Sequence, residues 1–289
     1  MEPAIYLPHA RLAALREPRP YEAAASGLWA AGSLDGLRLP CVAIVGTRAA
    51  TPYGTRLAHA FALALGRAGC CVVSGLALGI DAAAHRGALE AGSPTIGVLG
   101  CGHDHFFPRR NRELAERMIA AGGAVLSPFA PEVVAYPSQF LDRNGIVAAL
   151  ADAVVVIEAP ARSGALNTAG WAAGRIPVLA VPGDVDRPHV QGCLALIRDG
   201  ATLARTPDDV LEAIGMAAGP RPRARRAPPA DPLGRELLAA LRDGHESLDA
   251  LVAATGANAA AVLASLAMLE IDGRIESRGG GTYATLEVL

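Results

Sequence analysis

The chain has 289 residues, of which 52% are hydrophobic and 19% are charged. Its 26 basic residues, all of them Arg, nearly balance 28 acidic residues, and the formal net charge of −2 excludes a protein that coats nucleic acid through bulk charge. A local Arg-rich surface is still compatible with this balance, and the length suits one large domain or two modest ones.

No apolar run approaches the roughly 18 residues that a membrane-spanning helix needs. The first residues, Met1-Glu2-Pro3, do not open a signal peptide. The five cysteines are odd in number and contain no Cys-x-x-Cys pair, which favours reduced thiols over a disulfide or zinc framework. We therefore expect a cytoplasmic protein with no membrane association.

Residues 1–40 show no regular apolar period. A helical turn is expected at residues 12–15, and Pro18 and Pro20 end it. We expect this N-terminal stretch to be a short lead-in that packs on the main domain.

Between residue 41 and about residue 215, short apolar runs alternate with segments of helical period. The runs are almost wholly apolar, as strands buried on both faces of a parallel sheet are. Strands are expected at Cys41–Val45, Cys71–Val73, Thr95–Leu99, Ala124–Leu126, Ala153–Ile157 and Pro177–Val181. Helices are expected at Tyr53–Arg67, Ile80–Glu90 and Arg110–Ala121. This repetition predicts an α/β domain over 41–215 with a doubly wound parallel sheet, in which ligands bind where strands end and helices begin.

Residues 216–230 are rich in Pro and Arg and match neither a helix nor a strand. Four Arg, at positions 221, 223, 225 and 226, have no acidic neighbour before Asp231. We interpret the segment as a stiff, extended linker. It could serve as a solvated tether or as an auxiliary strap that contacts phosphates.

Residues 231–289 have the outline of a winged helix. Three helices are expected at Leu233–Leu241, Leu248–Ala253 and Asn258–Leu269, followed by a hairpin formed by Arg274–Ser277 and Thr282–Thr285. The segment has four Arg against nine acidic residues, and its third helix has no Arg. Because a helix that reads a DNA groove needs donors for phosphates and bases, we expect this domain to contact protein rather than duplex DNA.

Three strand ends of the α/β domain carry small residues that favour anion binding. The first strand runs into Gly46-Thr47-Arg48 just before a helix, where backbone N–H groups, the helix dipole and a guanidinium would converge on a phosphate. Ser74-Gly75 and Ser163-Gly164 form similar turns after later strands. The nicotinamide fingerprint Gly-x-Gly-x-x-Gly and the phosphate-loop Lys are both missing. An alternative role for Thr47 is that of a plain helix cap.

Phe140, Arg143 and Asn144 lie close together before a predicted helix. A Phe that can stack on a base, next to an Arg and an Asn, is typical of sites for single-stranded nucleic acid. The alternative is that Phe140 belongs to the core, as most Phe side chains in α/β domains do.

The remaining polar residues indicate neither catalysis nor metal binding. Cys101, His103 and His105 alternate in a Gly-rich loop without a fourth ligand, so we expect a loop that shapes the pocket rather than a zinc site. Asp81 fits a helix start better than a catalytic acid, and His85 is expected to be packed or partly exposed. With no paired carboxylates and no nucleophile beside a base, we expect a phosphate binder that is not an enzyme and uses no cofactor.

Taken in order, these segments resemble the DNA-processing protein A family, also called DprA or Smf. The resemblance covers roughly residues 37–214, and the trailing unit resembles the family's winged-helix appendage. The matching pieces are Val45–Arg48, Ser74–His85, Gly100–Gly102, Ser163–Ala169, Val181–Gly183 and Leu196–Ala201. The resemblance implies an extended Rossmann-like domain that binds single-stranded DNA, usually forms a homodimer and has no catalytic turnover. It also implies a role in natural transformation, in which the protein protects incoming DNA and helps to load a RecA-type recombinase.

Carried over by motif, Arg48 would contact a phosphate, as would the turns at Ser74-Gly75 and Ser163-Gly164. Phe140, Arg143 and Asn144 would line the same groove. The chain departs from the family where members commonly read Phe-Pro-x-Arg-Asn-Arg, because Gly145 replaces an Arg and Asp142 adds a negative charge. Leu194 also stands where members often carry Asn. Losing one phosphate contact lowers the salt dependence of single-strand binding by about 0.7 in log–log slope.

Two other functions are weighed against this reading. One is a nucleotide-hydrolysing enzyme on a related sheet, similar to the phosphoribohydrolases. Those enzymes carry Pro-Gly-Gly-x-Gly-Thr-x-x-Glu at the fifth turn, whereas Trp171 stands here at the position of the Glu. The other is an interaction scaffold with weakened DNA binding, which Asp142 and Gly145 would favour.

Overall fold

The computed structural model describes residues 3–15, 27–216, 231–278 and 280–286. The chain divides into two compact units, one within residues 1–219 and the other within residues 220–289, and each is described by itself. Apart from Met216, the predicted linker at 216–230 lies outside the described residues.

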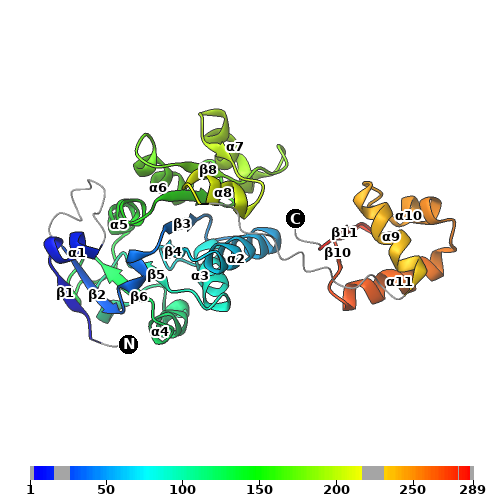
Figure 1. Cartoon of the computed structure of the whole chain (residues 1–289). Coiled ribbons are helices and arrows are strands. Elements are labelled where there is room, and N and C mark those ends of the chain that lie inside the picture. The colour runs from blue at the N-terminus through cyan, green and yellow to red at the C-terminus, as the bar shows by residue number, and fades with distance from the viewer. Residues whose placement is uncertain (1–2, 16–26, 217–230, 279, 287–289) are drawn as a thin grey trace. The chain divides into compact units, whose positions relative to one another are not determined.

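A nine-stranded sheet forms the centre of the first unit, in the order β1-β2-β6-β5-β4-β3-β7-β8-β9 (Figure 1). Every neighbouring pair from β6 to β9 is parallel, whereas the β1–β2 and β2–β6 pairs are antiparallel. The strands are β1 Ile5–Leu7, β2 Leu28–Gly32, β3 Cys41–Val45, β4 Cys71–Ser74, β5 Thr95–Val98, β6 Ala124–Ser127, β7 Ala153–Val156, β8 Val178–Ala180 and β9 Thr202–Leu203. The predicted α/β class and its six parallel strands are confirmed, each to within one residue at either end.

In its described residues, the N-terminal stretch contains a helix and two strands, of which the sequence predicted only the helical turn at residues 12–15. These elements are β1, α1 (His9–Leu15) and β2, and β2 pairs with β6 from Trp29 opposite Ser127 to Gly32 opposite Ala124. Leu28, Ala30 and Ala31 are all buried, so the alternation that marks a half-exposed strand is missing from this short run.

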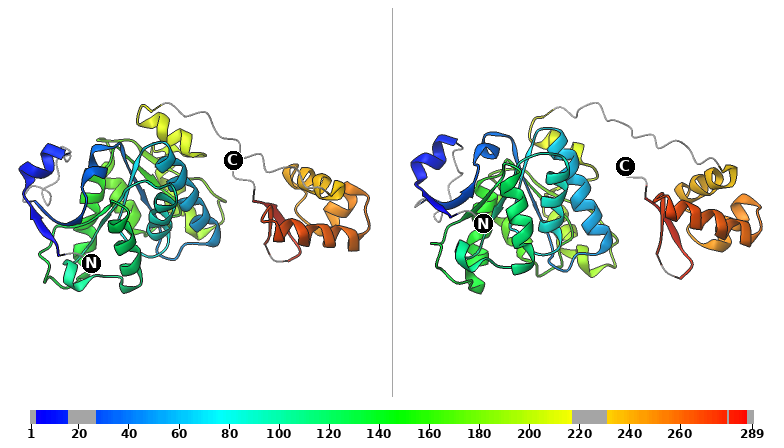
Figure 2. Two further views of the ribbon diagram at one scale, coloured as in Figure 1. Left: turned by 60° about the horizontal axis from the view of Figure 1, so that its bottom comes forward. Right: turned by 90° about the horizontal axis from the view of Figure 1, so that it is seen from below.

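Helices cover both faces of the sheet, as the two views in Figure 2 show. In β3, Cys41, Ala43 and Val45 pack on one face, whereas Val42 and Ile44 pack on the other, as the two-residue period of a strand requires. The helices are α2 Pro52–Arg67, α3 Ile80–Glu90, α4 Arg112–Ala120, α5 Pro137–Ala149, α6 Gly164–Ala172, α7 Gln191–Arg198 and α8 Pro207–Ala213. The predicted helix from Arg110 begins two residues later, because Arg109–Asn111 is a 3₁₀ turn.

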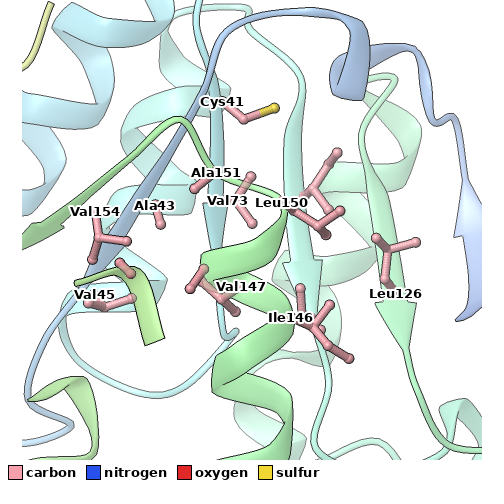
Figure 3. Packing of buried hydrophobic residues seen from close by; sticks show 14 of the residues in the cluster. Cys41, Ala43, Val45, Val73, Leu126, Ile146, Val147, Leu150, Ala151 and Val154 are labelled. Carbon is pink, nitrogen blue, oxygen red and sulfur yellow. The ribbon is translucent and has the colours of Figure 1, made fainter. Parts of the chain in front are cut away.

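Two layers of apolar side chains hold these helices in place. On one face, Ile146 and Val147 of α5 and its C-cap Leu150 pack on strand residues such as Val45 and Val73 (Figure 3). On the other face, α2 and α3 pack against β3, β4 and β7. The buried side chains of α5 fix the direction of this helix, and therefore the position of its N-terminal turn beside the carboxyl ends of the strands.

The second unit has the predicted winged-helix elements. They are α9 Pro232–Arg242, α10 Leu248–Thr255, α11 Ala259–Ile271, β10 Ile275–Ser277 and β11 Tyr283–Thr285. Asp231, Ser247 and Asn258 cap the three helices by accepting backbone N–H bonds, and Leu237, Leu251 and Leu266 belong to its small core. On α11, Leu263, Met268 and Ile271 are exposed.

Among the described residues, no single helix is long and apolar enough to cross a bilayer. Helices α10 and α11 pass the test of length and composition only as a pair, across a bend of 109°.

Candidate functional site

The strand order reverses between β3 and β7. From β3 the chain steps outward through β4, β5 and β6, and it then returns to place β7, β8 and β9 on the other side. In open α/β sheets, ligands bind beyond the carboxyl ends of the strands at such a reversal. The loops after β3, β4, β5 and β7 therefore define the candidate site, and the predicted residues 46–48, 74–75 and 163–164 lie on three of them.

The turn after β3 is held by backbone contacts. The Thr47 N–H donates to the carbonyl oxygen of Glu158 at 2.8 Å, and the Thr47 carbonyl oxygen accepts the N–H of Ile80 at 3.3 Å. The Thr47 hydroxyl accepts the N–H of Ala49 at 3.2 Å, a contact within the loop, so the alternative role of a helix cap belongs to Thr51 and not to Thr47. A Cβ at Gly46 would lie 2.5 Å from a side-chain carbon of Ile80, so only Gly allows this close approach.

The N-terminus of α2 already holds an anion that belongs to the chain. The buried carboxylate of Glu158 accepts the Thr51 N–H at 2.9 Å and also the Thr51 hydroxyl. Thr51 in turn caps the helix by accepting the N–H of Gly54 at 3.0 Å. A phosphate at this helix terminus would meet the negative charge of Glu158, which the sequence pattern did not predict. Of the groups at this turn, the exposed Arg48 guanidinium is therefore the one that is free to meet an external anion.

Arg48 and Phe140 form the exposed centre of the site. The Arg48 guanidinium lies over the Phe140 ring, 5.2 Å from its centroid, and it has no carboxylate partner within the described parts of the chain. Phe140 is half-buried and meets Phe107 edge to face, with ring centroids 5.9 Å apart. Phe107 is 48% exposed, so its ring presents a free surface next to a guanidinium. The arrangement brings together the predicted Arg48 and Phe140.

The turn at Ser74-Gly75 is buried, and its polar groups are bound internally. The Ser74 hydroxyl donates to the carbonyl oxygen of Ile44 at 2.6 Å. The Gly75 N–H donates to the Asp81 carboxylate at 3.1 Å, and the Gly75 carbonyl oxygen accepts the Arg143 guanidinium. These contacts leave the turn without the free donors that its sequence predicts.

Arg143 and Asn144 lie in the interior rather than along an open groove. They are 4% and 9% exposed, because their turn of α5 faces the sheet. The Asn144 amide donates to the carbonyl oxygen of Gly164 at 3.1 Å and to Asn167 at 3.3 Å, so it joins α5 to α6. Ser163 caps α6 by accepting the N–H of Ala165 at 3.3 Å, and Gly164 is exposed at the surface.

The segment 107–112 belongs to the same surface, although it was not among the residues predicted from the sequence. Phe107, Arg109, Arg110 and Arg112 are exposed, whereas Asn111 between them is buried. The segment reads Phe-Pro-Arg-Arg-Asn-Arg, which is the order of residue types that the resemblance places at 140–145. This order of residue types was the sequence feature from which the segment could have been predicted to belong to the site. The segment adds three exposed guanidiniums within five residues of Phe107, and that of Arg112 lies over the Phe106 ring, 5.8 Å from its centroid.

Burial favours the neutral form of two histidines of the first unit, His85 and His103. His103 is buried and its Nε2 lies 3.0 Å from the carbonyl oxygen of Val125, and burial lowers its pKa. Burial also lowers the pKa of His85 to about 3, with Arg143 and Arg86 adding to the shift. Within the described ranges, no group of three or more His, Cys, Asp or Glu side chains could hold a metal ion.

Comparisons with known proteins agree with this architecture. The family model for DNA recombination-mediator protein A matches residues 14–215, and the model for the DprA winged helix domain matches residues 221–281. A Mycobacterium tuberculosis protein that carries the name DNA processing protein DprA is 42% identical over 264 residues, which cover 88% of this chain and 67% of that protein. The Escherichia coli protein Smf is 35% identical over 263 residues, which cover 88% of this chain and 70% of Smf.

Two solved structures are similar to the first unit. DNA processing protein A of Streptococcus pneumoniae has a TM-score of 0.62 and 37% identity, covering 67% of this chain and 70% of that one. DNA processing protein A of Helicobacter pylori has a TM-score of 0.60 and 29% identity, covering 68% of this chain and 91% of that one. The H. pylori protein is described as having a unique single-stranded DNA binding mode.

Proposed function

Because the chain belongs to the DNA recombination-mediator protein A family, we propose that it binds single-stranded DNA at the carboxyl edge of its sheet. The observation that carries the proposal is the exposed surface of Phe107, Phe140, Arg48 and the Arg residues of segment 107–112. Aromatic rings next to guanidiniums are what a flexible single strand requires, since bases stack on the rings and phosphates meet the charges.

The same surface favours single strands over duplex. In a duplex the faces of the bases are stacked on one another and are closed to a protein ring, whereas an unpaired base can stack on Phe107. Arg48 lies over the Phe140 ring, and Arg109, Arg110 and Arg112 follow Phe107 within five residues, so we expect one strand to meet rings and charges together.

We propose that the protein acts by binding rather than by turnover. In this role, it protects incoming DNA in the cytoplasm during natural transformation and passes the strand to a RecA-type recombinase. It does so as a homodimer. The names of the S. pneumoniae and H. pylori relatives support the DNA-processing part of this role, and the site geometry supports the binding part.

The winged-helix unit has a separate role in this proposal. Helix α11 has no Arg, and the exposed Leu263, Met268 and Ile271 give it an apolar surface that suits contact with protein. Residues 231–289 contain nine acidic residues against four Arg, and this excess of negative charge also disfavours contact with phosphates.

Fluorescence anisotropy with labelled oligo-dT and with a duplex of equal length tests the proposal. We expect tighter binding to oligo-dT, and Phe107→Ala should weaken it roughly fivefold or more, because stacking of one base contributes about 1–3 kcal/mol. Ile5→Ala is the control, since Ile5 is an exposed apolar residue on the edge strand β1. Equal binding of both DNAs would contradict the proposal, and absence of any retention on oligo-dT would favour the scaffold alternative.

A further inference from the structure

Arg143 is used inside the protein. Its guanidinium donates to the carbonyl oxygen of Gly75 and, at 2.5 Å, to the carbonyl oxygen of Val98, and its Nε donates to Asn144 at 3.2 Å. The first two carbonyls lie at the ends of β4 and β5. The side chain is 4% exposed, so it spans the gap between two strand ends instead of facing solvent.

Asp81 binds the other side of the same peptide segment. Its carboxylate accepts the N–H of Gly75 at 3.1 Å and of Ala77 at 3.3 Å, and the residue is 5% exposed at the start of α3. Burial raises the pKa of Asp81 and lowers the pKa of Arg143 to about 10, while the attraction between the two charges opposes both shifts. Arg143 therefore keeps its charge at neutral pH.

Asn111 completes the arrangement from a third element. Its amide donates to the carbonyl oxygens of Leu76 at 2.8 Å and of Ala77 at 3.0 Å, and it is 2% exposed. Leu76 has a φ of 54°, a backbone conformation that a branched side chain rarely adopts, and these contacts hold it there. Asp81, Asn111 and Arg143, here called the turn clamp, thus bind both N–H and C=O groups of residues 75–77.

The turn clamp joins the elements that carry the exposed surface. Arg143 lies on α5, less than one helical turn from Phe140, and its guanidinium is 6.0 Å from the Phe140 ring. Asn111 lies within the segment that carries Phe107, Arg110 and Arg112. Through residues 75–77, the two halves of the aromatic and basic surface are therefore fixed to one rigid point.

We propose that Asp81, Asn111 and Arg143 are positioning residues, which hold Phe140 and the segment 107–112 in register for a single strand without touching it. This inference rests on the proposed function and deepens it, because Arg143 then supports the binding surface from inside the protein and does not contact a phosphate. Arg suits the position because its Nη1 donates to both carbonyls while its Nε donates to Asn144, and the single ammonium of Lys does not reproduce these separate donors in one plane.

The salt dependence of oligo-dT binding separates a support from a contact. A residue that neutralises a phosphate contributes about 0.7 to the slope of log K against log salt on single strands, whereas a support contributes nothing. We expect Arg143→Gln to weaken oligo-dT binding about fivefold or more through the misplaced rings, with the slope of the wild type. A slope smaller by about 0.7 would overturn the inference.

Asn111→Ala keeps the inference testable if Arg143→Gln does not fold, as judged by far-ultraviolet circular dichroism. Asn111 has no charge, so we expect weaker binding, an unchanged slope and a coupling to Phe107. In the Phe107→Ala background, Asn111→Ala should then cost less than about half of its effect in the wild type, because the ring that it positions is gone. Additive effects, or wild-type affinity of Asn111→Ala, would overturn the inference.

These outcomes also separate the inference from the proposed function. If the wild type binds oligo-dT and a slope of about 0.7 is lost at Arg143, only the positioning role fails. If the wild type does not bind oligo-dT, the proposed function fails and the positioning role fails with it.

Discussion

Arg48 provides the sharpest test of where the strand lies. Its guanidinium is exposed, contacts only the Phe140 ring among the described residues, and has no competing carboxylate there. The charge is therefore available to a phosphate at little desolvation cost. Arg48→Ala removes this charge, and the ring contact that is lost with it contributes only about 0.5–1 kcal/mol at an exposed site.

The magnitude follows from the number of exposed guanidiniums at the site. If Arg48, Arg109, Arg110 and Arg112 each neutralise one phosphate, the wild-type slope is about −2.8, which corresponds to an affinity roughly 50-fold weaker at 200 mM than at 50 mM salt. Removing Arg48 should bring the slope to about −2.1, so that the mutant and wild type differ by a further factor of about 2.6 between the two salts.

Anisotropy titrations of oligo-dT at four or more salt concentrations measure both slopes. Arg67→Ala is the matched control, since Arg67 is exposed at the last turn of α2, about 22 Å along the helix from its N-terminus and near the opposite edge of the sheet. An unchanged slope for Arg48→Ala, or an equal loss for Arg67→Ala, would refute the placement of the strand beside Arg48.

Three further predictions concern the supporting structure. Gly75→Ala places a Cβ against the Arg143 guanidinium and should lower the free energy of unfolding by about 1–3 kcal/mol in urea, whereas an unchanged midpoint contradicts the tight packing. Glu158→Ala leaves the Thr51 N–H and hydroxyl without their acceptor and should cost about 1–3 kcal/mol in the same assay; a neutral result would mean that water replaces the carboxylate. Burial lowers the pKa of His85 to about 3 in the folded protein, so only the unfolded chain takes up a proton at this residue as the pH falls below 6.5. The free energy of unfolding therefore falls with the pH over this range. Between pH 6.5 and 5.5 the wild type should lose about 1 kcal/mol that His85→Gln does not lose, and parallel pH profiles would contradict this.

The strands and the winged helix could be predicted because their buried positions are apolar, and the spacing of these positions in the sequence indicates the type of element. Runs such as Ala153–Val156 are apolar at every position, as a strand between two helical layers must be. Strand β2 escaped prediction because its pairing with β6 depends on a partner nearly 100 residues away, and its own Ala and Gly residues give little period. Local pattern carries no information about that partner.

The site was predictable in part, for a different reason. Arg48 and Phe140 were found from the residue types near strand ends, and both reach the surface. Arg143 and Asn144 were found by the same criterion but are buried, because the criterion does not tell which side of α5 faces the sheet. The segment around Asn111 shows the same limit of the criterion. Asn111 is buried, whereas its neighbours Arg110 and Arg112 are exposed, and residue type alone does not distinguish them.

The Gly-containing turns of this chain show why small residues before a helix are weak evidence for a phosphate site. Such a turn exposes backbone N–H groups to whichever anion is nearest, and a carboxylate of the chain itself is always present at high effective concentration. Asp81 fills this role at residues 75–77, and Glu158 fills it at the start of α2. The sequence feature to look for is therefore an Asp or Glu in the first turn of the next helix or just after a neighbouring strand. Where such an acid is present, we expect it to bind the N–H groups of the turn in place of an external anion. By this criterion, we expect an external phosphate to bind at the exposed guanidiniums near Phe107 and Phe140 and not at the buried turns.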